Sequence, residues 1–112
     1  MEFVRGDTFP FKFKLSMSDG SVIATSDIAT LYITCRKSTY KESPIIFQKK
    51  LDDVTIKDGY CHVVFDPQDT ENLMYGDYYF DVEVTLKSGY KKTKLFSFTL
   101  TEETTIFESV VE

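Results

Sequence analysis

Three side chains in this sequence have the chemistry of a nucleophile, a proton carrier or a zinc ligand: Cys35, Cys61 and His62. A thiol beside an imidazole is the pairing of a cysteine nucleophile with its base. Cys61 and His62 lie in an alternating apolar run, however, and neighbouring residues of a strand point to opposite faces. Cys35 with His62 remains geometrically possible, but three ligands without paired spacing fall short of a zinc site. We therefore expect no catalytic residues, no metal and no cofactor.

The two cysteines leave two interpretations open. Cys35 and Cys61 both fall in apparent strands, so a disulfide between them is conceivable, but two cysteines are too few for a disulfide scaffold. The N-terminus MEFVRGDTF has no apolar signal-peptide region. We favour two reduced thiols packed as small hydrophobes, in a protein made in the cytoplasm.

Two polar motifs have a simpler structural explanation than a functional one. Asp66, Asp69 and Glu71 surround Pro67, which is the pattern of a short helix start rather than of a calcium loop. Arg5-Gly6-Asp7 spells an integrin-binding tripeptide, but Gly and Asp before a Phe-rich strand are ordinary turn residues.

Tyrosines outside the expected core are the best candidates for an interaction surface, because tyrosine combines apolar area with a hydroxyl group. The candidates are Tyr32, Tyr40, Tyr75, Tyr79 and Tyr90. The same side chains could stack on sugars, and tyrosine is also simply a good strand former.

The acidic charge of the chain is concentrated at its end. Residues 102–112 contain four Glu and no Lys or Arg, and the rest of the chain has thirteen basic and fourteen acidic groups. A nearly neutral body cannot neutralise many phosphates, so we expect no nucleic-acid partner. No segment has the roughly 18–20 apolar residues of a membrane helix, so we expect no membrane partner. The tail also holds apolar residues, which we add to the candidate interaction surface: Ile106, Phe107, Val110 and Val111.

Alternation of apolar and polar residues predicts about seven strands in residues 1–101. They cover residues 9–17, 30–36, 44–51, 54–56, 60–65, 78–86 and 90–100, and one helical turn follows Asp66. In the third strand we expect Ile45, Phe47 and Leu51 to point inward. Asp58-Gly59 and Lys87-Ser88-Gly89 mark turns, and the last two strands must pair antiparallel. This pattern predicts an all-β, immunoglobulin-like antiparallel sandwich, followed by an acidic-apolar tail at 102–112.

Tyr78 stands at the start of the penultimate strand. In immunoglobulin-like sandwiches a tyrosine at this place hydrogen-bonds back across the corner between two strands. Tyr78 is therefore our candidate for the tyrosine of a structural corner. The alternative interpretation is that Tyr78 is simply one more aromatic side chain in the core.

The order and spacing of several short motifs resemble one family of virus proteins. The motifs are Arg5-Gly6-Asp7-Thr8-Phe9, Asp19-Gly20, Asp58-Gly59-Tyr60, Asp66-Pro67-Gln68-Asp69-Thr70 with Leu73, the run from Gly76 to Val84, and Phe98-x-Leu100-Thr101. They span about residues 3–105. The chain resembles small immunoglobulin-like proteins of tailed bacteriophages and prophages, including the N-terminal domain of siphophage upper baseplate proteins.

The resemblance implies a non-enzymatic structural or assembly protein of the virion, in the tail, baseplate or neck or as a decoration protein. Its partners would be other virion proteins, and a homo-oligomer is possible. Upper baseplate proteins continue into long fibre-forming regions, whereas this sequence ends at Glu112. This difference favours an adaptor or decoration role. The alternative from the residues alone is a carbohydrate- or cell-surface-binding module that uses the exposed tyrosines.

Overall fold

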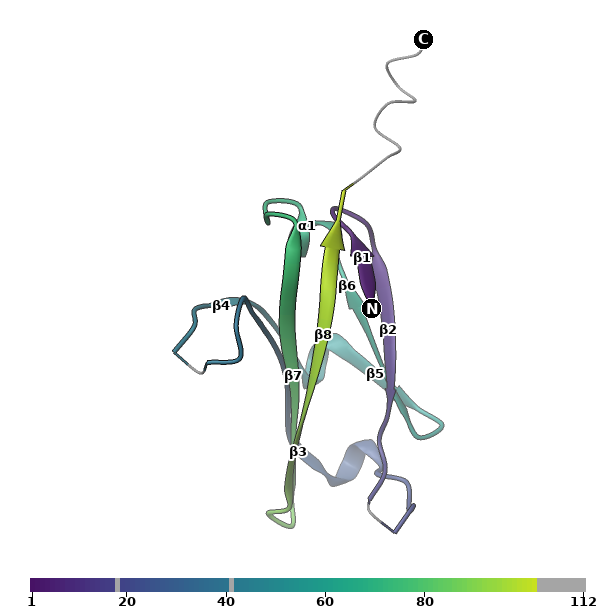
Figure 1. Ribbon diagram of the computed structural model, residues 1–112. Coiled ribbons are helices and arrows are strands. Elements are labelled where there is room, and N and C mark those ends of the chain that lie inside the picture. Colours follow the sequence, from purple (N-terminus) through teal and green to yellow (C-terminus); the bar gives the residue numbers. More distant parts are fainter. Residues whose placement is uncertain (18, 41, 103–112) are drawn as a thin grey trace.

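Two β-sheets make up most of the computed structural model, which describes residues 1–17, 19–40 and 42–102. The larger sheet has the strand order β1 (Glu2–Val4), β8 (Lys91–Thr101), β7 (Gly76–Leu86), β3 (Ile28–Arg36) and β4 (Ile45–Lys50). The smaller sheet has the order β2 (Phe9–Lys14), β6 (Tyr60–Phe65) and β5 (Val54–Lys57). The sheets pack face to face (Figure 1), which confirms the predicted immunoglobulin-like β-sandwich.

The helical elements are single turns: η1 (Thr25–Asp27), η2 (Leu51–Asp53) and α1 (Pro67–Thr70). In the described part of the chain, no helix has the length and apolar character needed to cross a membrane. The predicted turn after Asp66 is α1, with Pro67 in its first turn and the Asp66 backbone N–H donating to Asp69 Oδ2 at 2.7 Å.

An ion pair joins α1 to the edge strand β4. Lys49 Nζ lies 2.8 Å from Asp69 Oδ2 and 3.2 Å from Asp66 Oδ2. Burial lowers the pKa of Lys49, but the hydrogen bonds and charges of Asp69 and Asp66 outweigh burial and raise the pKa overall. The carboxylates of this turn are therefore engaged in capping and in holding a strand.

Strand β1 is the element that the sequence did not reveal, and its pairing with β8 is parallel, in contrast to the antiparallel pairs elsewhere. Three residues are too few to show alternation, so a tertiary contact defines this strand. Phe3 is only 1% exposed, and its ring stacks on Phe9 at 3.7 Å and on Phe98 at 4.4 Å between centroids. Burial of one phenylalanine thus fixes the N-terminus on the sandwich.

One inward-facing prediction was wrong. Ile45 is 52% exposed, whereas Phe47 and Leu51 pack against the core as expected. The register between β3 and β4 shifts at Cys35 and Arg36, because Ile46 is an extra residue in β4. Such a bulge turns the side chains that precede it to the opposite face of the sheet. Ile46 therefore packs on the core in place of Ile45.

The turn at Asp58-Gly59 shows why glycine is needed there. Asp58 has φ 54° and Gly59 has φ 83°, so both central residues are left-handed. Two such residues between antiparallel strands make the tight turn whose twist matches a hairpin. This turn joins β5 and β6 in the smaller sheet.

Phenylalanine rings fill the space between the sheets. Phe65 of the smaller sheet meets Phe80 of the larger one edge-on, with ring centroids 5.4 Å apart. Phe11 meets Phe80 and Phe96 in the same manner, each at 5.3 Å. Edge-to-face rings add to the gain from buried area, so these contacts hold the two sheets together.

Tyr78 is both buried and hydrogen-bonded. Its side chain is 4% exposed, its ring stacks on Phe98, and its hydroxyl group donates to the Met74 carbonyl oxygen at 2.6 Å. This bond runs four residues back along the chain, across the corner that leads from α1 into β7. The hydroxyl group therefore holds the loop between α1 and β7 in place.

Replacing Tyr78 by Phe is expected to lower the free energy of unfolding by about 1–1.5 kcal/mol, since the Met74 carbonyl loses its donor while the ring remains. Urea unfolding followed by fluorescence measures this difference. Tyr79→Phe is the matched control, because Tyr79 points to the outer face, and its change should be smaller. Equal stability of Tyr78→Phe and the parent protein would show that the corner bond contributes nothing.

Candidate functional site

The side chains with nucleophile or proton-carrier chemistry do not form a catalytic group. Cys35 and Cys61 are free thiols, each 0% exposed, and they lie in different sheets. His62 lies exposed on the outer face of β6, opposite to Cys61. Burial raises the pKa of both thiols from 9.0 to about 12, with a further contribution from Asp69 at Cys35. Such thiols are poor nucleophiles at neutral pH.

Metal ligands are likewise dispersed. Within residues 1–17, 19–40 and 42–102, no three His, Cys, Asp or Glu side chains gather in a way that could hold a metal ion. The tripeptide Arg5-Gly6-Asp7 has contacts within the fold. Arg5 Nη1 donates to the Leu73 carbonyl at 3.3 Å, and the Gly6 N–H donates to Thr70 Oγ1 at 3.0 Å. Both bonds tie the turn between β1 and β2 to α1 and the loop after it.

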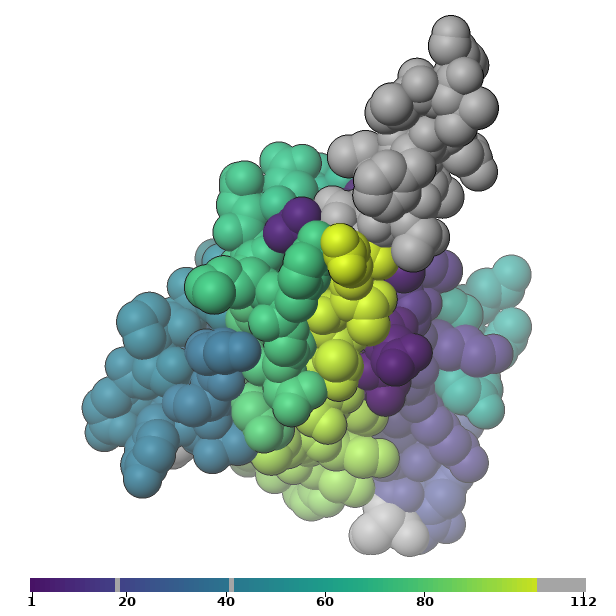
Figure 2. All heavy atoms as spheres, turned by 45° about the horizontal axis from the view of Figure 1, so that its top comes forward, coloured from purple at the N-terminus to yellow at the C-terminus, as the bar shows by residue number. Residues whose placement is uncertain are grey.

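The candidate tyrosines lie in separate places. Tyr75 and Tyr90 flank the two ends of the strand β7, whose eleven residues span about 36 Å at 3.3 Å each. Tyr40 is 75% exposed on the loop between β3 and β4, which projects from the body of the molecule (Figure 2). Tyr32 and Tyr79 are half-buried on the outer face of the five-stranded sheet. These side chains therefore do not form one surface.

Individual tyrosines have partners of their own. The Arg5 guanidinium lies over the Tyr75 ring, 4.3 Å from its centroid. Tyr79 borders a small hollow of about 100 Å³ beside Arg36 and Asp81, whose charged groups are 3.7 Å apart. Tyr90 lines a much larger cleft. The other candidates, Ile106, Phe107, Val110 and Val111, lie outside the described residues.

The larger cleft, of about 460 Å³, opens between β2 and the first half of β8. Its volume lies in the range of sites that bind ligands. We call it the β2–β8 cleft and define it by its lining: Phe11, Lys12, Phe13, Lys14, Leu15, Ser16, Ile23, Val82, Val84, Leu86, Tyr90, Lys92, Lys94 and Phe96. Its floor is apolar and four lysines surround it.

The cleft exists because β8 is longer than the surface that covers it. Phe98 and Leu100 are buried under β1 and the smaller sheet, and Phe96 is half-buried. The same face continues with Lys94 and Lys92, which are exposed. The core therefore ends at Phe96. From Phe96 back to Lys91, the inner face of β8 is open to solvent.

One side of the cleft is an unpaired strand edge of β8. The Thr99 N–H donates to the Met1 carbonyl at 2.9 Å, and the Arg5 N–H donates to the Thr101 carbonyl at 3.0 Å, so these backbone groups face β1. Successive residues of a strand direct their backbone N–H and C=O groups to opposite edges. Thr93, Leu95 and Ser97 therefore direct theirs to the same edge of β8 as Thr99 and Thr101. In the described part of the chain, β1 covers only Thr99 to Thr101 on this side.

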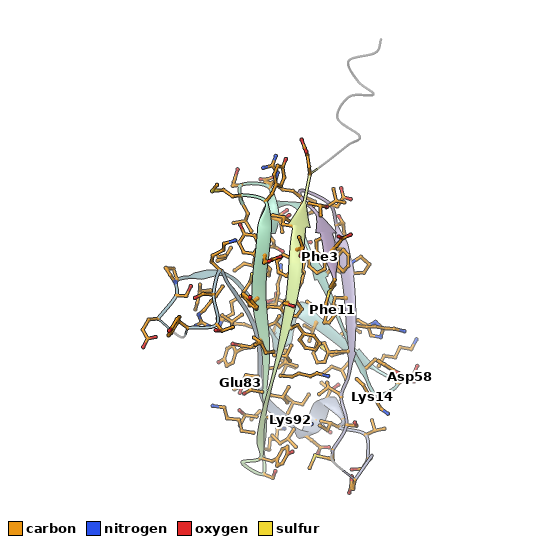
Figure 3. The ribbon with its side chains drawn as sticks, in the orientation of Figure 1. Phe3, Phe11, Lys14, Asp58, Glu83 and Lys92 are labelled. Carbon is orange, nitrogen blue, oxygen red and sulfur yellow. The ribbon has the colours of Figure 1, made fainter. Side chains whose placement is uncertain are left out.

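Strand β2 provides the other edge. The Leu15 N–H donates to the Gly59 carbonyl at 2.8 Å, so the alternate residues from Phe9 to Phe13 also face β6 with their backbone groups. Lys12 and Lys14 therefore turn theirs toward the open side. Pro10 stands in the same alternation, where its missing N–H costs no hydrogen bond. Figure 3 shows Phe11 between the sheets, with Lys14 and Lys92 on the two strands that border the opening.

The charge of the cleft has one sign. Its lining holds four lysines and no carboxylate. Lys12 Nζ lies 5.1 Å from the centroid of the Tyr60 ring and Lys94 Nζ lies 5.3 Å from that of Phe96. Among the described residues, no ion pair neutralises Lys14 or Lys92. The cleft can therefore accept a ligand that is apolar in part and negatively charged in part.

Sequence reasoning missed this site, although one signal was present. Lys92 and Lys94 share the alternation of Phe96, Phe98 and Leu100, so they stand on the inward face of their strand. Charges at inward positions are a known device of strand edges. The sequence did not show that β2 would lie opposite these lysines. The two strands come close together only because the two sheets pack on each other.

Comparison with known proteins identifies the fold. No protein-family model and no curated protein matches this chain. The chain is similar to the soluble domain of PmoD from Methylocystis sp. ATCC 49242 (Rockwell), with 15% identity, TM-score 0.51, and coverage of 89% of this chain and 77% of that one.

Two further similarities are weaker by TM-score. CopC from Methylosinus trichosporium OB3b matches with TM-score 0.44 and 14% identity over 70% of each chain. Murine CRIg matches with TM-score 0.44 and 7% identity, over 93% of this chain and 92% of that one. At these identities the likeness concerns the sandwich fold alone.

The buried thiols generate a prediction about pH. Unfolded thiols ionise near pH 9.0 and the folded ones near pH 12, so ionisation favours the unfolded chain between these values. Stability is therefore expected to be unaffected by the thiols below pH 9 and to fall as the pH rises from 9 toward 12. Urea unfolding at a series of pH values checks the trend, with a variant Cys35→Ala, Cys61→Ala as control for other groups. An identical fall in parent and variant would contradict the assignment to the thiols.

Proposed function

We propose that this chain is a non-enzymatic structural or assembly protein of a phage virion, which docks to other virion subunits through the β2–β8 cleft. The observation that carries the proposal is an apolar cleft bordered by two strand edges that no other described strand pairs. Strand edges bind extended segments of other proteins by adding a strand, with backbone hydrogen bonds providing affinity and side-chain pockets providing specificity. The cleft offers both kinds of contact.

The character of the partner segment follows from the lining. Phe11, Phe13 and Phe96 are half-buried, so a partner that covers them gains by removing apolar surface from water. Lys14 and Lys92 favour carboxylates beside the apolar side chains. The expected partner is therefore an extended, acidic and apolar segment of a protein.

The virion setting is supported by the sequence motifs that resemble phage immunoglobulin-like proteins, and by the kind of surface that the fold presents. The Asp66-Pro67-Gln68-Asp69-Thr70 motif forms the capped turn α1, and Tyr78 of the next motif forms the corner bond. These motifs build the frame and leave the cleft exposed. A rigid frame with an accessible docking cleft suits a subunit that is repeated in a particle.

A sugar-binding role has less support. Such a site needs aromatic rings gathered on one surface, and the exposed tyrosines Tyr40, Tyr75 and Tyr90 lie on a projecting loop and beside the two ends of β7. We therefore do not propose it as the function.

Incorporation into particles tests the proposed function. The tagged chain, produced in the host bacterium during particle assembly, is expected in gradient-purified particles at a constant ratio to the other structural proteins. Lys14→Glu with Lys92→Glu should reduce this ratio at least about fivefold, because reversing two charges in the cleft repels an acidic partner. Quantitative mass spectrometry of the particles measures the ratio.

The matched control is Lys50→Glu with Lys57→Glu, which makes the same change of charge on the exposed outer edges β4 and β5. Control particles should retain the protein. Absence of the parent protein from particles, or equal incorporation of both double variants, would contradict the proposal.

A further inference from the structure

We propose that the β2–β8 cleft of one copy binds residues 102–112 of a second copy as an added strand, so that the chain assembles with itself head to tail. This inference rests on the proposed docking role of the cleft and names its partner. It follows from the charge of the cleft, from the composition of the segment, and from the place where β8 ends.

Charge is the first support. The cleft lining carries four lysines and no carboxylate, and residues 102–112 carry Glu102, Glu103, Glu108 and Glu112 without any Lys or Arg. The rest of the chain is almost balanced, with thirteen basic and fourteen acidic groups. The two regions are thus the most one-sided in charge that the chain offers, and they are opposite in sign. Such complementarity selects partners and sets their register.

The composition of the segment suits a strand that pairs with an edge. Thr104, Thr105, Ile106, Val110 and Val111 are β-branched and Phe107 is aromatic, which are the residue types that favour strands. The segment contains no proline and no glycine. Every residue can therefore donate or accept a backbone hydrogen bond in an added strand.

Alternation sorts the segment into faces that match the cleft. In an extended segment Phe107 and Val111 point to one side, while Glu108 and Glu112 point to the other together with Ile106 and Val110. The first pair fits the floor of Phe11, Phe13 and Phe96. The second pair then lies on the outer face, where Lys12 and Lys14 alternate with Phe11 and Phe13 along β2.

The geometry of β8 favours a second copy over the same chain. Residues 102–112 follow Thr101, and the open edge at Thr93 to Ser97 lies four to eight residues back, about 13–26 Å away along the strand. Strand β1 occupies the intervening edge at residues 99–101. A segment that turns back in its own chain uses about 13 Å of its roughly 36 Å passing β1, so only its second part can lie beside the open edge. A second copy can deliver the whole segment.

Such binding joins unlike surfaces of two copies. A head-to-tail contact of this kind builds rings when the rotation closes and open filaments when it does not. Either outcome repeats one subunit by symmetry, which is the arrangement that a virion protein needs.

Light scattering after size-exclusion chromatography tests the inference on the full chain. The mass is expected to rise with concentration above that of one chain. Deleting residues 102–112 should return the protein to a monomer at every concentration, and Lys14→Glu with Lys92→Glu should do the same without altering the segment. Lys50→Glu with Lys57→Glu is the control and should assemble as the parent does. A full chain that is monomeric at every concentration overturns the inference, including the case in which it binds its own segment.

A synthetic peptide of residues 102–112 tests the contact itself. Among the described residues, every buried core residue lies within residues 1–101, so the shortened chain keeps that core, and its urea unfolding checks that it is folded. Fluorescence anisotropy should show that the labelled peptide binds the shortened chain, about tenfold more weakly when Lys14 and Lys92 are reversed to Glu and within roughly twofold in the control variant. No binding of the peptide to the folded shortened chain overturns the inference.

Methylated peptides distinguish an added strand from a purely ionic contact. One peptide carries N-methyl groups at residues 106, 108 and 110, and the other at 107, 109 and 111. A strand that pairs with one edge loses binding in one peptide only, and a strand that pairs with both edges loses it in both, so either result supports the inference. Unchanged binding of both peptides overturns it.

The two proposals fail in different ways. A monomeric chain that is still incorporated into particles through Lys14 and Lys92 leaves the proposed function intact and removes the self-docking inference. A chain that assembles with itself but is absent from particles keeps the inference about the contact and removes the virion role.

Discussion

The packing of phenylalanine rings between two sheets of unequal width is the constraint on which the rest of this structure depends. The larger sheet has five strands and the smaller one three, so the smaller sheet cannot cover the inner face of the larger one completely. Phe3, Phe65, Phe80 and Phe98 fill the covered part, each at most 2% exposed. Where the rings end, at Phe96, the inner face of β8 changes to lysine and the sandwich opens.

The charged groups are distributed in agreement with this packing. Lys49 is held between Asp66 and Asp69 at the capped turn, and Arg36 and Lys91 lie near Asp81 and Glu83 on the outer face. Each of these cations has a carboxylate neighbour, and the ion pairs connect elements of the fold. The lysines of the β2–β8 cleft have no ion pair with a carboxylate among the described residues. What sets the cleft apart is that four lysines gather around one apolar floor whose lining contains no carboxylate.

Much of the frame was predictable from single residues and their spacing. The alternating runs around Phe11, Leu31 and Val82, the turn at Asp58-Gly59 and the helix start at Pro67 depend on neighbours in the sequence, and each has its predicted form. Ile45 was misplaced because a bulge in β4 depends on how that strand aligns with β3. Strand β1 was missed because three residues carry no periodic signal, and only the burial of Phe3 makes them a strand.

The sequence by itself determined that the chain forms strands, which side of most strands is apolar, and that its last eleven residues are acidic and apolar. These properties are local, because backbone alternation and turn chemistry act between neighbouring residues. The tertiary structure alone decided that β2 lies opposite the unpaired half of β8, and that Lys14 and Lys92, far apart in the sequence, border one cleft. That arrangement arises from the unequal width of two sheets packed over shared rings, a relation between distant segments that no local pattern records.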